Sequence, residues 1–172
     1  MMRRYWDTNC FLGVLNEEQD KIGRCRAVLR EAENGAVRIV TSALTLTEVL
    51  WPKGVPVPLP KHDAEKIHKF FRHEWIVVYD VDRTLAESAR DVVWNHSVQP
   101  KDAIHVATAL DAKVDQFDTF DGPLIRLSGK IGDPPLVIGE PDLPQTLFDQ
   151  IAEQSEAAAL PEDEGVEVEE SP

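Results

Sequence analysis

Four acidic residues lie at predicted strand ends or within predicted helices, where a carboxylate could take part in a functional site: Asp7, Glu48, Asp102 and Asp121. Glu48 is the hardest of them to explain locally, because it lies within the apolar segment SALTLTEVLW and a buried carboxylate without a partner is costly. Carboxylates that converge on one crevice repel each other unless a cation compensates their charge. Oxygen-only ligands favour Mg²⁺ or Mn²⁺ over zinc. The four acids are therefore candidate ligands of a divalent cation.

Each of the other three acids also has a purely local explanation. Asp7 could be a turn residue or the N-cap of the first helix. Asp102 lies in the first turn of a predicted helix and could complement the positive end of its dipole. Asp121 precedes Gly122-Pro123, which is typical of a turn. Taken singly, each acid is weak evidence for a site.

The segments that must position these acids alternate between strands and helices. Strand-like runs cover residues 3–7, 37–40, 75–79, 114–118 and 136–139. Helical patterns begin near residue 9 and cover residues 20–34, 41–50, 61–73, 82–95, 100–113 and 121–130. This alternation predicts an α/β fold with a mainly parallel sheet and helices on both faces. In such a sheet, residues just past the strand ends converge on one crevice.

Local signals set several of the predicted boundaries. The hydroxyls of Thr41 and Ser42 are candidate N-caps for a helix that runs through Leu50 and ends at Trp51-Pro52. Asp82 is a candidate N-cap for the helix over residues 82–95. Pro100 is expected at the first turn of the next helix.

The charge of the chain is unevenly distributed. All 18 Lys and Arg residues fall within the first 130 residues with 19 acidic ones, whereas residues 131–172 hold 12 acidic residues. The near-neutral body is compatible with nucleic-acid binding, which a net charge of −13 would otherwise disfavour. Cys10 and Cys25 have no paired spacing and are expected as reduced thiols in a cytoplasmic protein. No apolar run is long enough to cross a membrane.

Four motifs occur together and in order. They are Asp7-Thr8-Asn9, Thr45-Leu46-Thr47-Glu48, the segment Asp102-Ala-Ile-His-Val-Ala-Thr-Ala-Leu110 and Thr119-Phe120-Asp121. Over residues 3–140 this series resembles the PIN domain family, in particular the VapC-like toxins. The motif in residues 102–110 is the most specific of the four.

The composition changes near Pro141, so the acidic tail over residues 142–172 is expected to form a weak helix and then become disordered. The resemblance implies a PIN-like three-layer α/β domain over residues 1–141. It further implies a ribonuclease that depends on Mg²⁺ or Mn²⁺, often the toxin of a toxin–antitoxin pair. Its partners would be an RNA substrate, a cognate antitoxin protein and a second copy in a homodimer. Asp7, Glu48, Asp102 and Asp121 would be the catalytic metal ligands, and Asn9 and Thr119 would support them by hydrogen bonds.

Three alternatives stay open. Asp118 competes with Asp121 for the fourth acidic place. The strand end Asp80-Val-Asp82 resembles the first motif of haloacid-dehalogenase-type phosphatases, although it also fits a simple helix start. A PIN-like scaffold could also bind RNA or a partner without cutting. His105, three residues after Asp102, could assist a leaving group, but a hydrogen-bonded structural histidine is the commoner case.

Overall fold

A five-stranded parallel sheet forms the centre of the computed structural model, which describes residues 1–51 and 54–142. The strands are β1 (Met2–Trp6), β2 (Val37–Ser42), β3 (Ile76–Tyr79), β4 (Gln116–Asp118) and β5 (Ile138–Gly139). Their spatial order is β3-β2-β1-β4-β5, and each neighbouring pair is parallel. The predicted parallel sheet is confirmed.

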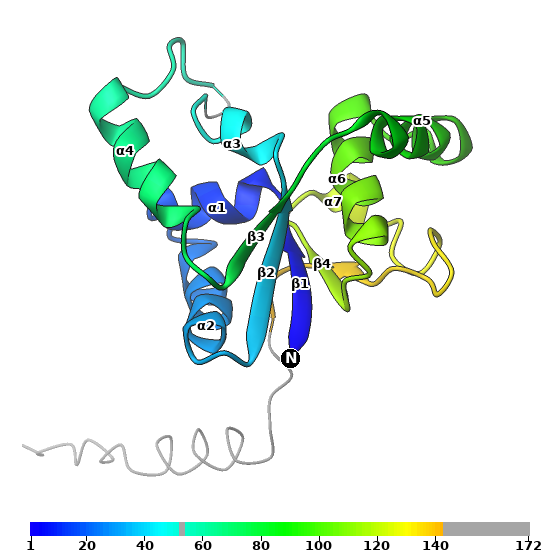
Figure 1. Ribbon diagram of the computed structural model, residues 1–172, viewed down its shortest axis with the longest axis horizontal. Coiled ribbons are helices and arrows are strands. Elements are labelled where there is room, and N and C mark those ends of the chain that lie inside the picture. The colour runs from blue at the N-terminus through cyan, green and yellow to red at the C-terminus, as the bar shows by residue number, and fades with distance from the viewer. Residues whose placement is uncertain (52–53, 143–172) are drawn as a thin grey trace, which may run out of the picture. The chain divides into compact units, whose positions relative to one another are not determined.

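Helices cover both faces of this sheet and complete three layers (Figure 1). One side carries α1 (Thr8–Leu15), α2 (Ile22–Glu33) and α4 (Lys61–Phe70). The other side carries α5 (Arg83–His96), α6 (Pro100–Asp111) and the short α7 (Gly122–Ile125). The four-residue helix α3 (Thr45–Glu48) follows β2. The predicted arrangement of helices around a central sheet is confirmed.

The central strand β1 packs into a core on each face, because successive side chains of a strand point to opposite sides. Tyr5 is buried in the cluster formed with α5 and α6, where its ring lies 4.7 Å from that of Phe117. Trp6 faces the α1 side and packs edge-on against Phe11 at 5.2 Å. Phe11 in turn contacts Phe71, just past α4, at 4.7 Å. Both faces of β1 are therefore fixed by buried aromatic rings.

The prediction that Thr41 and Ser42 cap a helix is wrong. Both residues belong to β2, where they pair with Val78 and Tyr79 of β3. The Thr41 hydroxyl donates to the carbonyl of Trp6 and lies 2.8 Å from the Thr45 hydroxyl, and no side chain caps the start of α3, whose N-cap is Leu44. Pairing with β3 extends the strand and leaves only four residues for α3, so the helix predicted to run through Leu50 is shorter than expected.

Other helix boundaries fall close to their predicted positions. Asp82 caps α5 as expected, since its carboxylate accepts a hydrogen bond from the Leu85 amide at 2.8 Å. Pro100 opens α6. By contrast, α4 ends at Phe70 and α7 at Ile125, so both helices are shorter than their sequence patterns suggested.

Residues 1–142 form one compact unit. From Leu143 onward, the predicted acidic tail with its weak helix and disordered end lies outside the described residues. In the part of the chain that the structure describes, no helix combines the length and the apolar character needed to span a membrane.

Candidate active site

The topology creates a crevice beside β1. The chain passes from β1 outward to β2 and β3, then returns to place β4 on the other side of β1. Ligand sites of open parallel sheets lie at the carboxyl ends of the strands where the strand order reverses in this way. Asp7 follows β1 directly, and Asp121 follows β4 by three residues. Two of the four acids therefore lie at this position because of the strand order.

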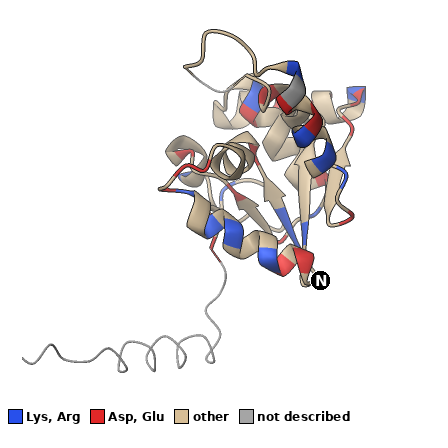
Figure 2. Cartoon of the chain, turned by 90° about the vertical axis from the view of Figure 1, so that its left-hand side faces the viewer, with Lys and Arg blue, Asp and Glu red and all other residues tan. Residues whose placement is uncertain are grey.

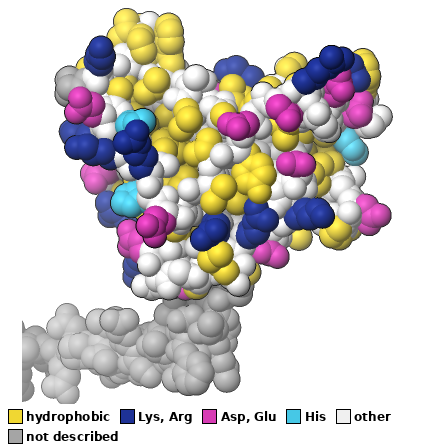
Figure 3. All heavy atoms as spheres, viewed as in Figure 1, with side chains coloured by type: hydrophobic (Ala, Val, Ile, Leu, Met, Phe, Trp, Pro, Cys, Tyr) yellow, Lys and Arg dark blue, Asp and Glu magenta, His cyan; other side chains and the backbone are white. Residues whose placement is uncertain are grey.

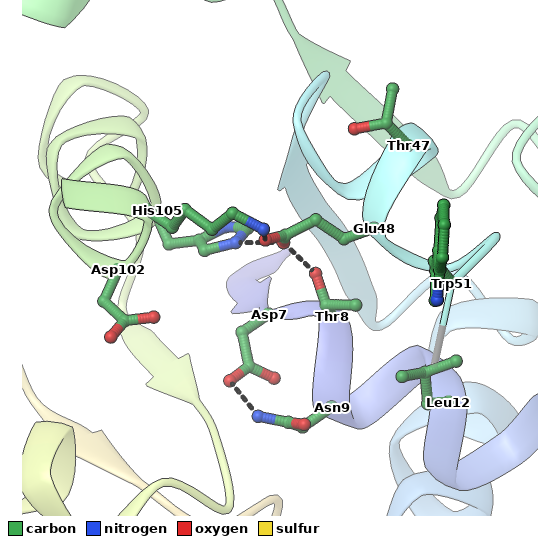
Figure 4. Close-up of a pocket in the computed structure, with 10 residues that line it drawn as sticks. Asp7, Thr8, Asn9, Leu12, Thr47, Glu48, Trp51, Asp102 and His105 are labelled. Atoms are coloured by element: carbon green, nitrogen blue, oxygen red, sulfur yellow. Dashed lines mark hydrogen bonds and ion pairs between the residues drawn. The ribbon is translucent and has the colours of Figure 1, made fainter. Parts of the chain in front are cut away.

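A pocket of about 590 Å³ lies at this edge and gathers three of the four predicted acids (Figure 4). Its lining residues are Asp7, Thr8, Asn9, Leu12, Thr47, Glu48, Trp51, Lys101, Asp102 and His105. The fourth acid, Asp121, lines an adjoining pocket of about 320 Å³ to which Asp102 also contributes. Asp102 thus connects Asp121 to the other three.

Asp7 is buried and held by several donors. Its carboxylate accepts hydrogen bonds from the Thr119 hydroxyl at 2.6 Å, the Cys10 amide at 3.1 Å and the Asn9 side chain at 3.3 Å. The Thr119 hydroxyl also accepts from the Asp121 amide at 2.9 Å, which ties the start of α7 to Asp7. Burial raises the pKa of Asp7, although these hydrogen bonds oppose the shift. Asp7 is the N-cap of α1, which was one of the two local roles considered from the sequence, and it also lines the pocket.

Glu48 is held by three donors from other elements. Its carboxylate accepts a hydrogen bond from the Thr8 hydroxyl at 2.5 Å and contacts His105 Nε2 at 2.9 Å and the Lys101 ammonium at 3.2 Å. Burial alone would raise the pKa of Glu48, but the hydrogen bonds from His105 and Thr8 outweigh it and lower that pKa to about 2. Glu48 is therefore ionised at neutral pH, and its placement in an apolar segment is explained by these partners.

His105 is a buried, fully hydrogen-bonded histidine. Its Nδ1 lies 2.7 Å from the Tyr5 hydroxyl, and its Nε2 lies 2.9 Å from Glu48 (Figure 4). Sequence reasoning expected a structural histidine but missed its link to Glu48, which lies 57 residues away. It also missed Thr8 and Lys101 as partners of Glu48. The sequence pointed to these two residues only by their position next to predicted site residues: Thr8 lies inside the first motif, and Lys101 directly precedes Asp102.

Asp102 shows the repulsion expected of clustered acids. It is half-buried in the first turn of α6. Burial raises its pKa, and the negative charges of Asp121, Asp7 and Glu48 raise it further. In Figure 4, Asp102 lies across the pocket from the side that carries Trp51 and Leu12. The acids from four segments are thus electrostatically coupled at one edge of the sheet.

Asp118 occupies a different environment from Asp121. Its side chain is fully buried and accepts two hydrogen bonds from the Arg4 guanidinium, at 2.8 and 2.5 Å, and one from the Trp6 indole at 2.9 Å. Burial raises the pKa of Asp118, and these three donors oppose that shift. Asp118 therefore forms a buried ion pair on the Trp6 face of the sheet, while Asp121 lies next to Asp102.

The strand end that suggested a phosphatase has a local role. Asp82 is occupied as the N-cap of α5, and Asp80 is exposed. Both follow β3, the edge strand, rather than the strands at the crevice. These two residues are explained by the helix start that the sequence also predicted.

The donor set of the pocket fits a hard divalent cation, but its present arrangement is not a formed metal site. No group of three or more His, Cys, Asp or Glu side chains within residues 1–51 and 54–142 is arranged to hold a metal ion. The carboxylate of Glu48 is already engaged by Thr8, His105 and Lys101. Burial raises the pKa values of Asp7 and Asp102, and the neighbouring carboxylates raise that of Asp102 further. Carboxylate oxygens are the ligands that Mg²⁺ and Mn²⁺ prefer.

Comparison with known proteins identifies the class to which this fold and site belong. The model of the PIN domain family matches residues 4–130. The chain therefore belongs to the PIN domain family, as its sequence motifs indicated. No curated protein sequence matches it.

Solved structures of toxin–antitoxin proteins share the fold at low sequence identity. Mycobacterium tuberculosis VapC20, described as a sarcin-ricin loop cleaving toxin, is 18% identical with a TM-score of 0.56, over 69% of this chain and 90% of VapC20. Rickettsia felis VapBC2, solved bound to a DNA fragment from its promoter, is 15% identical with a TM-score of 0.56, over 82% of this chain and 100% of that chain. A toxin–antitoxin complex from Klebsiella pneumoniae is 17% identical with a TM-score of 0.50, over 69% and 86%. At these identities the likeness shows a shared fold.

Proposed function

We propose that this protein is a divalent-metal-dependent endoribonuclease that cleaves RNA phosphodiester bonds and is the toxin of a toxin–antitoxin pair. The observation that carries the proposal is the shared pocket, in which Asp7, Glu48 and Asp102 come from three separate segments of a PIN-family chain. Asp121 adjoins them through Asp102. Acids placed together at such a cost in repulsion need a cationic partner to be useful.

Asp7, Glu48, Asp102 and Asp121 would hold Mg²⁺ or Mn²⁺ in this proposal. A divalent cation, when bound, supplies activation of water at neutral pH and neutralises the charge that builds on phosphate oxygens. Thr119 and Asn9 orient the Asp7 carboxylate by the hydrogen bonds described above. To accept the cation, Glu48 would have to exchange one of its present donors for it.

Basic residues on the helices of the α1 side would contact the RNA backbone. Figure 2 shows Lys and Arg residues along the helices of the side that carries α2 and α4. Lys61, His68, Lys69 and Arg72 line a shallow groove of about 390 Å³ on α4. In Figure 3, basic and histidine side chains, with acidic ones among them, lie at the margin of the molecule over α4. Such contacts fix the position of a backbone without reading its sequence.

A protein antitoxin and a second copy of the chain are the proposed partners. The support is the family membership and the fold shared with toxins that were solved together with antitoxins. Co-expression of the chain with the products of neighbouring reading frames, followed by size-exclusion chromatography, tests both. The proposal predicts a stable complex with one small neighbour and a dimeric mass for the isolated chain.

The test of the activity is cleavage of a synthetic RNA by protein stripped of metal with a chelator. Activity should return on addition of Mg²⁺ or Mn²⁺ and should be absent in Asp7→Asn. Asp80→Asn is the matched control, because it changes an exposed carboxylate outside the pocket and should retain full activity. RNA binding without cleavage under all metal conditions would instead make the chain a non-catalytic binding domain. Phosphate-ester hydrolysis lost in Asp80→Asn would favour the phosphatase alternative.

A further inference from the structure

One aromatic side chain on the wall of the acid pocket has no part in the chemistry described so far. Trp51 follows α3 and lines the same pocket as Asp7 and Asp102, yet 58% of its surface is exposed. In Figure 4 its ring lies at the side of the pocket opposite Asp102, the side that also carries Leu12. A large indole is normally buried or paired, so an exposed ring beside a polar site calls for an explanation.

The orientation of the Trp51 ring is fixed within the chain. Its Nε1 donates a hydrogen bond to the carbonyl of Val55 at 2.9 Å, which satisfies the one polar group of the indole. What remains available to a ligand is the aromatic face. Leu12, which is 8% exposed, and Thr47 form the neighbouring wall. This side of the pocket therefore presents a held aromatic ring beside Leu12 and Thr47, while the opposite side is acidic.

A second exposed tryptophan lies away from the pocket and provides a comparison. Trp94 on α5 is 69% exposed, but the Arg90 guanidinium lies over its ring at 4.9 Å. Trp94 does not line the acid pocket. It is a matched control for Trp51, because both are exposed indoles and only one adjoins the acids.

We propose that Trp51 is a base-stacking platform that binds an unpaired nucleobase next to the phosphate at the acidic residues. This inference rests on the proposed function and names the residue of this chain that would bind an unpaired base of the RNA substrate. Every base has a π face, and stacking on an aromatic side chain binds it without hydrogen-bond readout. Bases within a duplex are stacked on one another and are not available to such a platform. Lys101 lines the same pocket, where its ammonium forms an ion pair with Glu48 at 3.2 Å while its side chain stays 73% exposed, so the adjacent RNA backbone could also contact it.

The size and polarity of the pocket agree with this occupant. A volume of about 590 Å³ lies within the range of pockets that enclose small organic groups. The apolar wall of Trp51 and Leu12 suits the faces of a base, and the half of the pocket with Asp7, Asp102 and Lys101 suits a phosphate with its counter-ions. An aliphatic protein segment could pack against Trp51 and Leu12 but would leave the half of the pocket with Asp7, Asp102 and Lys101 without a partner.

The inference is tested by RNA binding in the cleavage-deficient background Asp7→Asn, measured by fluorescence anisotropy with a short single-stranded RNA. Adding Trp51→Ala should weaken binding by roughly 5- to 150-fold, the range expected for loss of one stacked base. Trp51→Phe should retain part of the affinity, and Trp94→Ala should leave it unchanged. One abasic position in the RNA should reproduce the loss of Trp51→Ala and should cause no further loss in that variant.

Several results would overturn the platform. One is an RNA affinity of Trp51→Ala equal to that of its parent. Another is that the losses of affinity from Trp51→Ala and from each abasic position simply add. A third is that Trp51→Ala weakens binding of a fully duplex RNA by the same factor. Unchanged RNA affinity with weakened binding of a co-expressed protein partner would show that Trp51 contacts that partner instead. Thermal melting of each variant checks that the fold is kept. If the wild type binds RNA through Trp51 but never cleaves it, the proposed activity fails while the platform stands.

Discussion

Replacing Asp7 separates its structural role from its proposed catalytic role. The Asp7 carboxylate caps α1 and accepts the Thr119 hydroxyl at 2.6 Å. Asn caps a helix about as well as Asp, so Asp7→Asn keeps the hydrogen bond from the Cys10 amide. The Asn NH2 group then takes the place of the oxygen that accepts from the Thr119 hydroxyl, so it can only donate to Thr119; this costs about 1 kcal/mol, but the change also removes a buried charge. We expect Asp7→Asn to be as stable as the wild type or slightly more stable, within about 1 kcal/mol.

Asp7→Ala should behave differently because it removes every acceptor at this position. The cap, which is the hydrogen bond from the Cys10 amide, is lost at about 1 kcal/mol, and the buried Thr119 hydroxyl loses its partner at about 1–3 kcal/mol. We therefore expect Asp7→Ala to be destabilised by roughly 2–4 kcal/mol relative to Asp7→Asn. Both variants should lose metal-dependent cleavage by about a thousand-fold or more, since removing a ligand forfeits several kcal/mol of transition-state stabilisation.

The pH dependence of stability gives this reasoning a second check. Burial raises the pKa of Asp7 in the folded protein, so the folded state binds the proton more tightly than the unfolded state does. Ionised Asp7 then costs folding stability as pH rises from about 4, where the unfolded side chain ionises, past the raised pKa. Without metal, the stability of Asp7→Asn relative to the wild type should increase over this window and then level off.

The measurements are denaturant unfolding with chelator at several pH values, and cleavage of a fluorogenic RNA with Mn²⁺. Cleavage retained by Asp7→Asn in preparations free of other ribonucleases would refute the role given to Asp7. A loss of more than about 2 kcal/mol in Asp7→Asn would refute the account of its hydrogen bonds.

The remaining predictions concern Asp118, Asp121 and His105. Asp121→Ala should lower cleavage strongly with little effect on unfolding, whereas Asp118→Ala should destabilise the fold by about 3–5 kcal/mol, because it leaves the Arg4 guanidinium buried and unpaired. A stable Asp118→Ala variant that has lost all cleavage would reverse this assignment. His105→Leu should raise the pKa of Glu48 from about 2, as followed by carbon NMR of its carboxyl. Ionised Glu48 contributes stability that is lost as pH falls from about 4.5 to about 2, so an unchanged acid unfolding profile in His105→Leu would contradict the His105 contact.

Local signals in the sequence were sufficient for the order of the elements and singled out the three acids that line the pocket. The spacing of apolar residues differs between strands and helices and can be recognised over short stretches of chain. The alternation of the two patterns therefore predicts a parallel α/β fold. The cap at Asp82 was predictable because a capping bond spans only a few residues. The acids Asp7, Glu48 and Asp102 were predictable because each stands in a recognisable motif.

Only the tertiary structure decided which partners the polar side chains find. Asp118 and Asp121 differ by three residues, but strand register places Asp118 opposite Trp6 and next to the Arg4 guanidinium, which leaves Asp121 beside Asp102. Pairing with β3 kept Thr41 in a strand, although its hydroxyl suits a helix cap. The hydrogen bond between Glu48 and His105 joins α3 to α6 across 57 residues. Such contacts depend on which strands become neighbours, and no local pattern in the chain records that choice.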